Sequence, residues 1–112
     1  MNMFEIKIGL ALAQDKSFIS NLCKEIKNLR KGLLFEYNYL IPKIRIRDAP
    51  SILNSYEFAI FFYDQKIYQA NLEENTLCQN EVYITFSLKK IIINNFTTTK
   101  KLNYRNDYRI GT

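Results

Sequence analysis

The twenty residues LRKGLLFEYNYLIPKIRIRD (29–48) contain the end of a helix and the start of a strand. Pro42 lacks a backbone N–H and disfavours helical geometry at the residue before it, so the helix must end upstream. After it, apolar and charged residues alternate as Lys43, Ile44, Arg45, Ile46, Arg47 and Asp48. Alternation of this kind has the period of a β-strand, so we expect a strand with buried isoleucines and outward-facing cations.

The helix is predicted over residues 18–37, where apolar residues recur at steps of three and four. These residues are Ile19, Leu22, Cys23, Ile26, Leu29, Leu33 and Tyr37. Such a stripe is typical of an amphipathic helix laid on a sheet. Asp15 or Ser17 can cap its start, and Asn38 suits a left-handed cap at its end. Gly32 within the helix costs about 1 kcal/mol relative to alanine.

Another strand is predicted ahead of the helix, at residues 4–13. Its sequence, FEIKIGLALA, places Phe4, Ile6, Ile8, Leu10 and Leu12 on one face. Strand, helix and strand in this order imply a right-handed crossover, which makes the two strands parallel.

Three more strands are predicted downstream. YEFAIFFY (56–63) and KIYQANL (66–72) flank Asp64-Gln65, which is the spacing of an antiparallel hairpin. EVYITFSL (81–88) alternates Val82, Ile84, Phe86 and Leu88 with more polar residues and predicts a fifth strand. The predicted fold class is therefore α/β (α+β): a two-layer β-α-β-β-β unit, with one long amphipathic helix packed on a mixed sheet.

The 112 residues predict a single domain, 1–112, with one modest core. Residues 102–112 are expected to form a last edge strand or a loose tail. No apolar run approaches the roughly 20 residues that span a bilayer, and the N-terminus lacks the pattern of a signal peptide. The prediction is a cytoplasmic protein with no membrane span in this chain.

The sequence offers little for catalysis. It contains no histidine, which removes the commonest general base and metal ligand, and it has no glycine-rich phosphate-binding motif. Asp15 with Glu25 and Lys27 mimics the spacing of a metal-dependent nuclease site, but Glu25 and Lys27 fall on the exposed face of the helix. We therefore expect no enzymatic activity and no cofactor or metal.

The two cysteines do not form a CxxC pair. Cys23 belongs to the apolar stripe of the helix, so a buried free thiol is predicted there rather than a disulfide or a zinc site. Free thiols are consistent with a reducing cytosol.

The charge of +5 permits an acidic partner. One sheet face is predicted to combine cations with aromatic rings: Lys7, Lys43, Arg45 and Arg47 with Phe61, Tyr63 and Tyr83. This face is interpreted in three ways: as a solvated surface, as a protein-binding surface, or as a small nucleic-acid-binding surface.

Residues 29–48 resemble the flagellar and type III secretion export-gate proteins of the FlhA type. The cytosolic region of that family typically reads IRRQLAQELGFVVPPVRIRD, which aligns without a gap. Identical residues are Arg30, Leu33, Glu36, Pro42, Arg45, Ile46, Arg47 and Asp48. Asn38 falls at a glycine of the family, in agreement with a left-handed cap.

The resemblance extends over residues 4–72. FEIKIGLAL resembles the LELEIGYGL that opens the first cytosolic subdomain, and YEFAIFFYDQKIYQANL aligns with NEYRIKIKGVEVARGEL after one extra loop residue. Residues 73–112, predicted as C-terminal strands or a tail, have no match. The membrane spans and further subdomains of the family are not expected in these 112 residues. The chain is therefore interpreted as a stand-alone relative, a subdomain-sized fragment or a diverged remnant.

The resemblance implies non-enzymatic work in protein secretion through protein–protein contacts. Implied partners are components of the export apparatus, export chaperones or substrates, and a homo-oligomer is an alternative; nucleic acid is the competing hypothesis. The implied location is cytoplasmic or peripheral to the inner membrane through a partner. The residues predicted to form protein contacts or structural ion pairs are Lys43, Arg45, Arg47 and Asp48.

Overall fold

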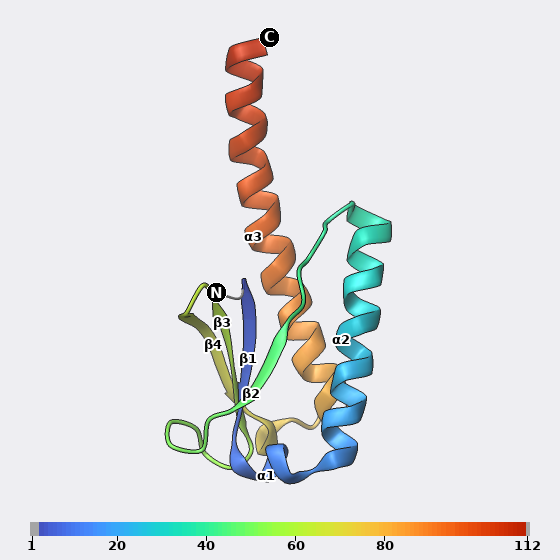
Figure 1. Ribbon diagram of the computed structural model, residues 1–112, viewed down its shortest axis with the longest axis vertical. Helices are drawn as coiled ribbons and strands as arrows, with labels where there is room; N and C mark the ends of the chain where they lie inside the picture. The colour runs from blue at the N-terminus through green and yellow to red at the C-terminus, as the bar shows by residue number, and fades with distance from the viewer. Residues whose placement is uncertain (1–2, 112) are drawn as a thin grey trace.

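A computed structural model describes the backbone of residues 3–111 and the side chains of residues 3–96. The elements, in chain order, are β1 (Phe4–Ile8), α1 (Leu10–Gln14), α2 (Lys16–Tyr37), β2 (Arg45–Asp48), β3 (Glu57–Phe62), β4 (Gln65–Asn71), the 3-10 turn η1 (Leu72–Glu74) and α3 (Asn80–Gly111) (Figure 1).

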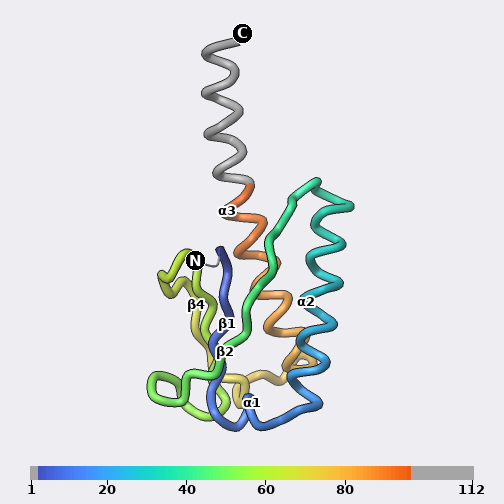
Figure 2. The backbone as a smooth tube through the Cα atoms, viewed as in Figure 1, coloured from blue at the N-terminus to red at the C-terminus, as the bar shows by residue number. Residues whose placement is uncertain are grey.

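The four strands form one mixed sheet in the order β2-β1-β3-β4. β1 and β2 are parallel, with Ile6 opposite Ile46, and the chain returns from α2 to lay β2 beside β1 (Figure 2). β1 pairs antiparallel with β3, and β3 with β4. The predicted parallel pair, hairpin and mixed sheet are confirmed.

The helices α2 and α3 contact each other and cover one face of the sheet (Figure 1). The core between these two layers draws on both. Its fully buried large side chains are Phe4, Ile6, Ile8, Leu22, Leu33, Phe58, Ile60, Ile84, Leu88 and Ile92. The predicted two-layer α/β fold class is confirmed, with a second helix beside the expected one.

The ends of α2 have the predicted caps. The side chain of Asp15 accepts a hydrogen bond from the backbone N–H of Phe18 at 3.0 Å. Asn38 has left-handed geometry (φ 58°, ψ 31°), and its N–H donates to the carbonyl groups of Leu33 and Leu34. Both caps satisfy backbone groups that a helix end leaves without partners.

The first strand is shorter than the predicted 4–13 and ends at Ile8. Gly9 donates its N–H to the carbonyl of Glu57 at 2.9 Å and begins the turn into α1. A Cβ atom on Gly9 would lie only 1.9 Å from the backbone oxygen of Asn54. The alternation that runs on to Leu12 is therefore helical after Gly9, where Leu12 is buried and Leu10 is exposed.

The predicted fifth strand at 81–88 is wrong, because these residues begin α3. Ile84 and Leu88 are buried, while Val82 and Phe86 are exposed. Residues four apart share one face in a helix and also in a strand, so the burial of Ile84 and Leu88 fits both. The predicted edge strand or tail at 102–112 is also helical in its backbone up to Gly111, and Thr112 lies outside the described residues.

The hairpin turn is centred one residue earlier than predicted. Tyr63 and Asp64 join β3 to β4, with φ angles of 47° and 68°. Positive φ at two successive residues is the geometry of the type I′ turns that match the twist of hairpin strands. It places Gln65 in β4 instead of in the turn.

Candidate protein-binding site

The sheet face opposite the helices carries a row of charged side chains from β1 and β2. Arg45 lies beside Glu5 in the parallel register, and Arg47 lies beside Lys7. Both arginines are exposed, as is Lys43 just before the strand. The predicted outward row of cations is therefore present.

Glu5 stands among these cations. Its carboxylate lies 3.9 Å from Lys7 Nζ and 4.0 Å from Arg47 Nη1. The Glu5 side chain is only 12% exposed, whereas that of Arg47 is 53% exposed. Pairs this open to solvent contribute at most about 1 kcal/mol. The ion pair of Arg47 with Glu5 is therefore weak.

Glu57 in β3 is another acidic residue of the sheet, and its carboxylate has other contacts. Its carboxylate accepts hydrogen bonds from the backbone N–H of Asn54 at 2.7 Å and from Gln69 Nε2 at 3.2 Å. Within residues 3–96, neither Glu57 nor Asp48 forms an ion pair with Arg45 or Arg47. The positive charge of Arg45 is therefore available to a partner.

The predicted mixture of cations and aromatic rings is present only in part. Lys7 Nζ lies 4.3 Å from the centre of the Phe61 ring, in a cation–π contact. Tyr83 belongs to α3 on the other side of the sheet, where its ring meets Phe58 edge-on at 6.0 Å. Tyr63 is in the hairpin turn and packs against Phe62 at 4.7 Å. The open face therefore lacks the tyrosine predicted from α3.

On the helix side of β2 there is a groove of about 490 Å³ between β2 and α2. Its lining is mostly apolar: Ile8, Ala13, Ile19, Cys23, Ile44 and Ile46, with Lys43, Arg45 and Asp48. Three of the four predicted site residues thus border one groove. Arg47 does not line it and instead lies with Glu5 on the open face.

Cys23 is exposed in the wall of this groove, so the prediction of a buried thiol is wrong. Its thiol is free, as predicted, and so is that of Cys78. β2 is an edge strand, and in the described part of the chain no strand pairs with its outer side.

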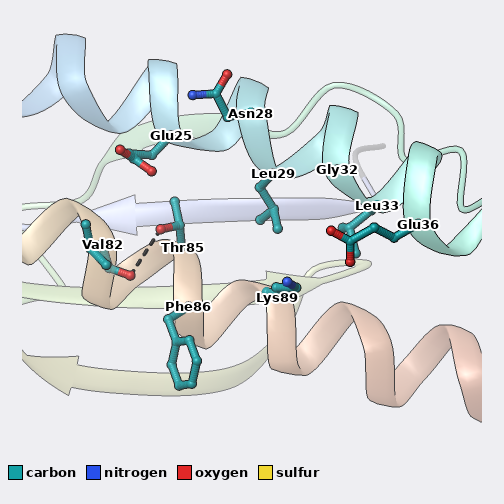
Figure 3. Close-up of a pocket in the computed structure, with 10 residues that line it drawn as sticks. All are labelled: Glu25, Asn28, Leu29, Gly32, Leu33, Glu36, Val82, Thr85, Phe86 and Lys89. Carbon is teal, nitrogen blue, oxygen red and sulfur yellow. Dashed lines mark hydrogen bonds between the residues drawn. The ribbon is translucent and has the colours of Figure 1, made fainter.

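A second groove, of about 340 Å³, lies between α2 and α3 (Figure 3). Leu29 and Leu33 of α2 and Val82 and Phe86 of α3 are among its lining residues, and Phe86 is 60% exposed. Charged side chains border it as well: Glu25, Glu36 and Lys89. This groove was missed in the sequence because residues 81–88 were predicted to be a strand.

The described residues contain no group of three or more side chains that could hold a metal ion. No helix in the same part of the chain has the length and apolar character needed to cross a bilayer.

Comparison with known proteins gives matches in structure only. No family model and no curated protein matches the sequence. CdsV of Chlamydia pneumoniae, solved in complex with CdsO, has a TM-score of 0.54 at 18% identity, covering 63% of this chain and 22% of CdsV. MxiA of Shigella flexneri has a TM-score of 0.58 at 10% identity, covering 97% of this chain and 44% of MxiA.

The chain therefore spans about a fifth of the CdsV structure and less than half of MxiA. Because the match to MxiA covers 97% of this chain, it extends past residue 72, where the sequence resemblance ends. This protein has the fold of part of the cytoplasmic domains of type III secretion export-gate proteins, the family that its sequence resembles.

Proposed function

We propose that this protein is a non-enzymatic binding or assembly module of a type III or flagellar protein-export apparatus, acting in secretion through protein–protein contacts. The observation that carries the proposal is the likeness of its fold to CdsV and MxiA, together with the residues 41–48 that resemble the same family. The module is a single domain, 1–112, and it works in the cytoplasm or at the inner membrane through a partner.

The proposed contact residues are Lys43, Arg45, Arg47 and Asp48. Their side chains are exposed at one edge of the sheet, beside an apolar groove. An apolar centre with a charged border is the usual composition of a protein interface. CdsV was solved with the protein CdsO, which supports proteins of the apparatus, chaperones or substrates as partners. Self-assembly is the alternative partner.

Nucleic acid is less well supported as a partner. Recognition of single strands combines a cationic groove with several rings on which bases stack. Here Lys7 already covers the Phe61 ring, and Tyr83 lies in the helical layer. We therefore do not propose nucleic-acid binding as a second function.

Co-purification tests the proposal. The tagged protein is expressed in its source organism, and the proteins retained with it are identified by mass spectrometry. We expect components of the export apparatus, and we expect fewer of them with the double variant Arg45→Glu/Arg47→Glu. The variant Lys66→Glu, on the opposite edge strand β4, is the matched control. Recovery of nucleic acid alone, or of no export component, would contradict the proposed function.

A further inference from the structure

The backbone of β2 has hydrogen-bonding groups that point away from the sheet. Ala49, just after β2, donates its N–H to the carbonyl of Ile8 in β1 at 2.8 Å. Backbone groups of successive residues in a strand point to opposite sides, so Arg45 and Arg47 also direct theirs toward β1. The N–H and C=O groups of Ile46 and Asp48 must then point to the open edge.

The rest of the fold leaves this edge uncovered. Among residues 3–111, β1 is the one strand that pairs with β2. Within residues 3–96, no hydrogen bond from outside β1 reaches the backbone of Ile46 or Asp48. A row of unpaired backbone groups at a sheet edge is a template for another strand.

We propose that the edge of β2 binds an extended segment of a partner protein by strand addition, and that this segment alternates apolar and acidic residues. The proposal deepens the proposed function, on which it rests, by naming the contact surface and the chemistry of its partner. In strand addition, backbone hydrogen bonds supply affinity and the pockets for alternate side chains supply specificity.

The apolar half of the pattern follows from the helix side of β2. There an added strand would place every second side chain over the groove, against Ile19, Cys23 and Ile46. Ile46 is half-buried and Cys23 is exposed, so apolar side chains would cover surface that α2 and β2 leave open. Burial of apolar surface favours binding by about 25 cal/mol for each Å² removed from water.

The acidic half follows from the other face. There the remaining side chains of an added strand would lie beside Arg45 and Arg47, with Lys43 just before them. Within residues 3–96, Arg47 is the one of these three cations that forms an ion pair, at 4.0 Å from Glu5, and Lys7 contacts the same carboxylate at 3.9 Å. Opposite charges on neighbouring strands stabilise the pair, and acidic residues would supply them.

The same charges disfavour a second copy of this chain as the added strand. Two β2 strands paired edge to edge would bring Arg45 and Arg47 of one copy beside those of the other. Like charges on adjacent strands are destabilising, and cations on an edge strand are a known defence against self-pairing. The partner is therefore a segment of a different protein.

A direct test uses the full chain, labelled with ¹⁵N, and an acetylated eight-residue peptide that alternates valine with aspartate. Amide hydrogen exchange of β2 is measured by NMR with and without the peptide. We expect the amides of Ile46 and Asp48 to exchange at least tenfold more slowly with peptide. The amides of Arg45 and Arg47, already bonded to β1, should change little. A peptide of the same composition in shuffled order, and one with lysine in place of aspartate, are the controls.

Two variants test the backbone and charge contributions separately. Ile46→Pro removes an N–H from the open edge without removing a bond to β1, and proline is tolerated on edge strands. Arg45→Glu keeps the backbone and reverses one charge. We expect each to weaken peptide binding by tenfold or more, measured by fluorescence anisotropy at low salt. Lys66→Glu, which makes the same kind of charge change on exposed β4, should bind like the native chain.

The inference is overturned if the peptide slows hydrogen exchange equally at all four β2 amides, or if it slows exchange in the α2–α3 groove instead. It is overturned as well if no alternating peptide binds. It is also overturned if Arg45→Glu binds the aspartate peptide as well as the native chain does. Circular dichroism shows whether Ile46→Pro folds. If it does not, the binding of Arg45→Glu and the pattern of amide exchange in the native chain still test strand addition. Peptide binding without co-purification of export components would refute the proposed function alone, and the reverse result would refute strand addition alone.

Discussion

The hydroxyl oxygens of Tyr68 in β4 and Tyr83 in α3 lie 3.0 Å apart and form a hydrogen bond between the sheet and the helical layer. The bond raises the pKa of Tyr83 above its ordinary value of 10.0, and partial burial and the nearby Glu74 and Cys78 act in the same direction. Both rings also pack against Phe58, at 5.8 and 6.0 Å, so the contact anchors α3 over the edge of the sheet.

The first prediction concerns the titration of Tyr83. Because the pKa of its phenol is higher in the folded protein than in the unfolded chain, the folded state retains this proton longer as pH rises. Its contribution to stability is therefore complete below pH 10 and is lost as pH rises through the folded-state pKa. In a titration by NMR of the tyrosine ring carbons, Tyr83 in the folded protein should ionise at higher pH than the tyrosines of the chain unfolded in urea.

The variant Tyr83→Phe provides the control. It should flatten the fall in the free energy of unfolding above pH 10, as measured by urea denaturation at several pH values. Ionisation of Tyr83 at or below the pH at which tyrosines ionise in the unfolded chain would show that the hydrogen bond to Tyr68 does not protect it.

The second prediction tests the helical assignment of residues 81–88. Leu88 is fully buried, whereas Phe86 is 60% exposed, with Lys90 Nζ 5.0 Å from its ring centre. Leu88→Ala should lower the free energy of unfolding by about 2–5 kcal/mol, as truncation of buried leucines does. Phe86→Ala should cost under about 1 kcal/mol. Equal, large losses at both positions would indicate the alternating burial of a strand.

The difference in burial between Leu88 and Phe86 explains why residues 81–88 were predicted to be a strand. Ile84 and Leu88 are consistent with either period, and the residues that distinguish them, Val82 and Phe86, are apolar but exposed. An exposed apolar residue looks in the sequence like a buried one. Further on, the helical step continues through Ile92, which is buried with Ile84 and Leu88.

The first half of the fold could be predicted because several local signals agreed there. Three local signals fit the same β-α-β arrangement. They are the apolar stripe of α2, its caps at Asp15 and Asn38, and the alternation around Ile46. The exposure of Cys23 could not be predicted in this way. It depends on whether a further strand lies beyond β2, which is a property of the sheet order and not of the local sequence.

The candidate site was predictable to the same degree. The outward row of cations follows directly from the alternation. The contact of Arg47 with Glu5 depends also on the register between β1 and β2. The groove beside Arg45 and Asp48 depends on the position of β2 at the sheet edge. The α2–α3 groove depends on α3, which the sequence pattern concealed.

The third prediction compares two glycines that the chain uses differently. Gly9 packs against the backbone of Asn54 and Ser55, where a Cβ atom would overlap both, while the same atom on Gly32 would meet nothing within 4 Å. Gly9→Ala should destabilise by about 3 kcal/mol or more through overpacking. Gly32→Ala should stabilise by about 0.5–1 kcal/mol, because alanine favours the helix. Urea denaturation measures both, and equal effects would refute this distinction.

The fourth prediction concerns the cap at Asn38, whose φ of 58° is unfavourable for most side chains. Asn38→Ala should lower the free energy of unfolding by about 1 kcal/mol, because a Cβ atom is strained in left-handed geometry. Asn38→Gly should keep or raise stability, since glycine adopts this geometry readily. The matched control is Asn28→Ala, at an exposed position within α2, where the same change should not destabilise. Loss of stability in Asn38→Gly would contradict the assigned geometry.

The last prediction concerns Glu5, which lies among cations on the open sheet face. Its carboxylate is 3.9 Å from Lys7 Nζ and 4.0 Å from Arg47 Nη1, and Arg45 is its partner in the strand register. Glu5→Gln removes the attraction and leaves three neighbouring cations to repel one another. We expect a loss of about 0.5–1 kcal/mol at low ionic strength.

Salt distinguishes this electrostatic cause from a change in packing. At about 1 M ionic strength the screening length falls to roughly 3 Å, so the difference between Glu5→Gln and the native chain should shrink. Asp64→Asn is the control, since it makes the same change of charge at a turn position whose φ of 68° suits asparagine. Its effect should be small at every salt concentration. A loss in Glu5→Gln that is independent of salt would mean that Glu5 stabilises the sheet through packing and not through Lys7 and Arg47.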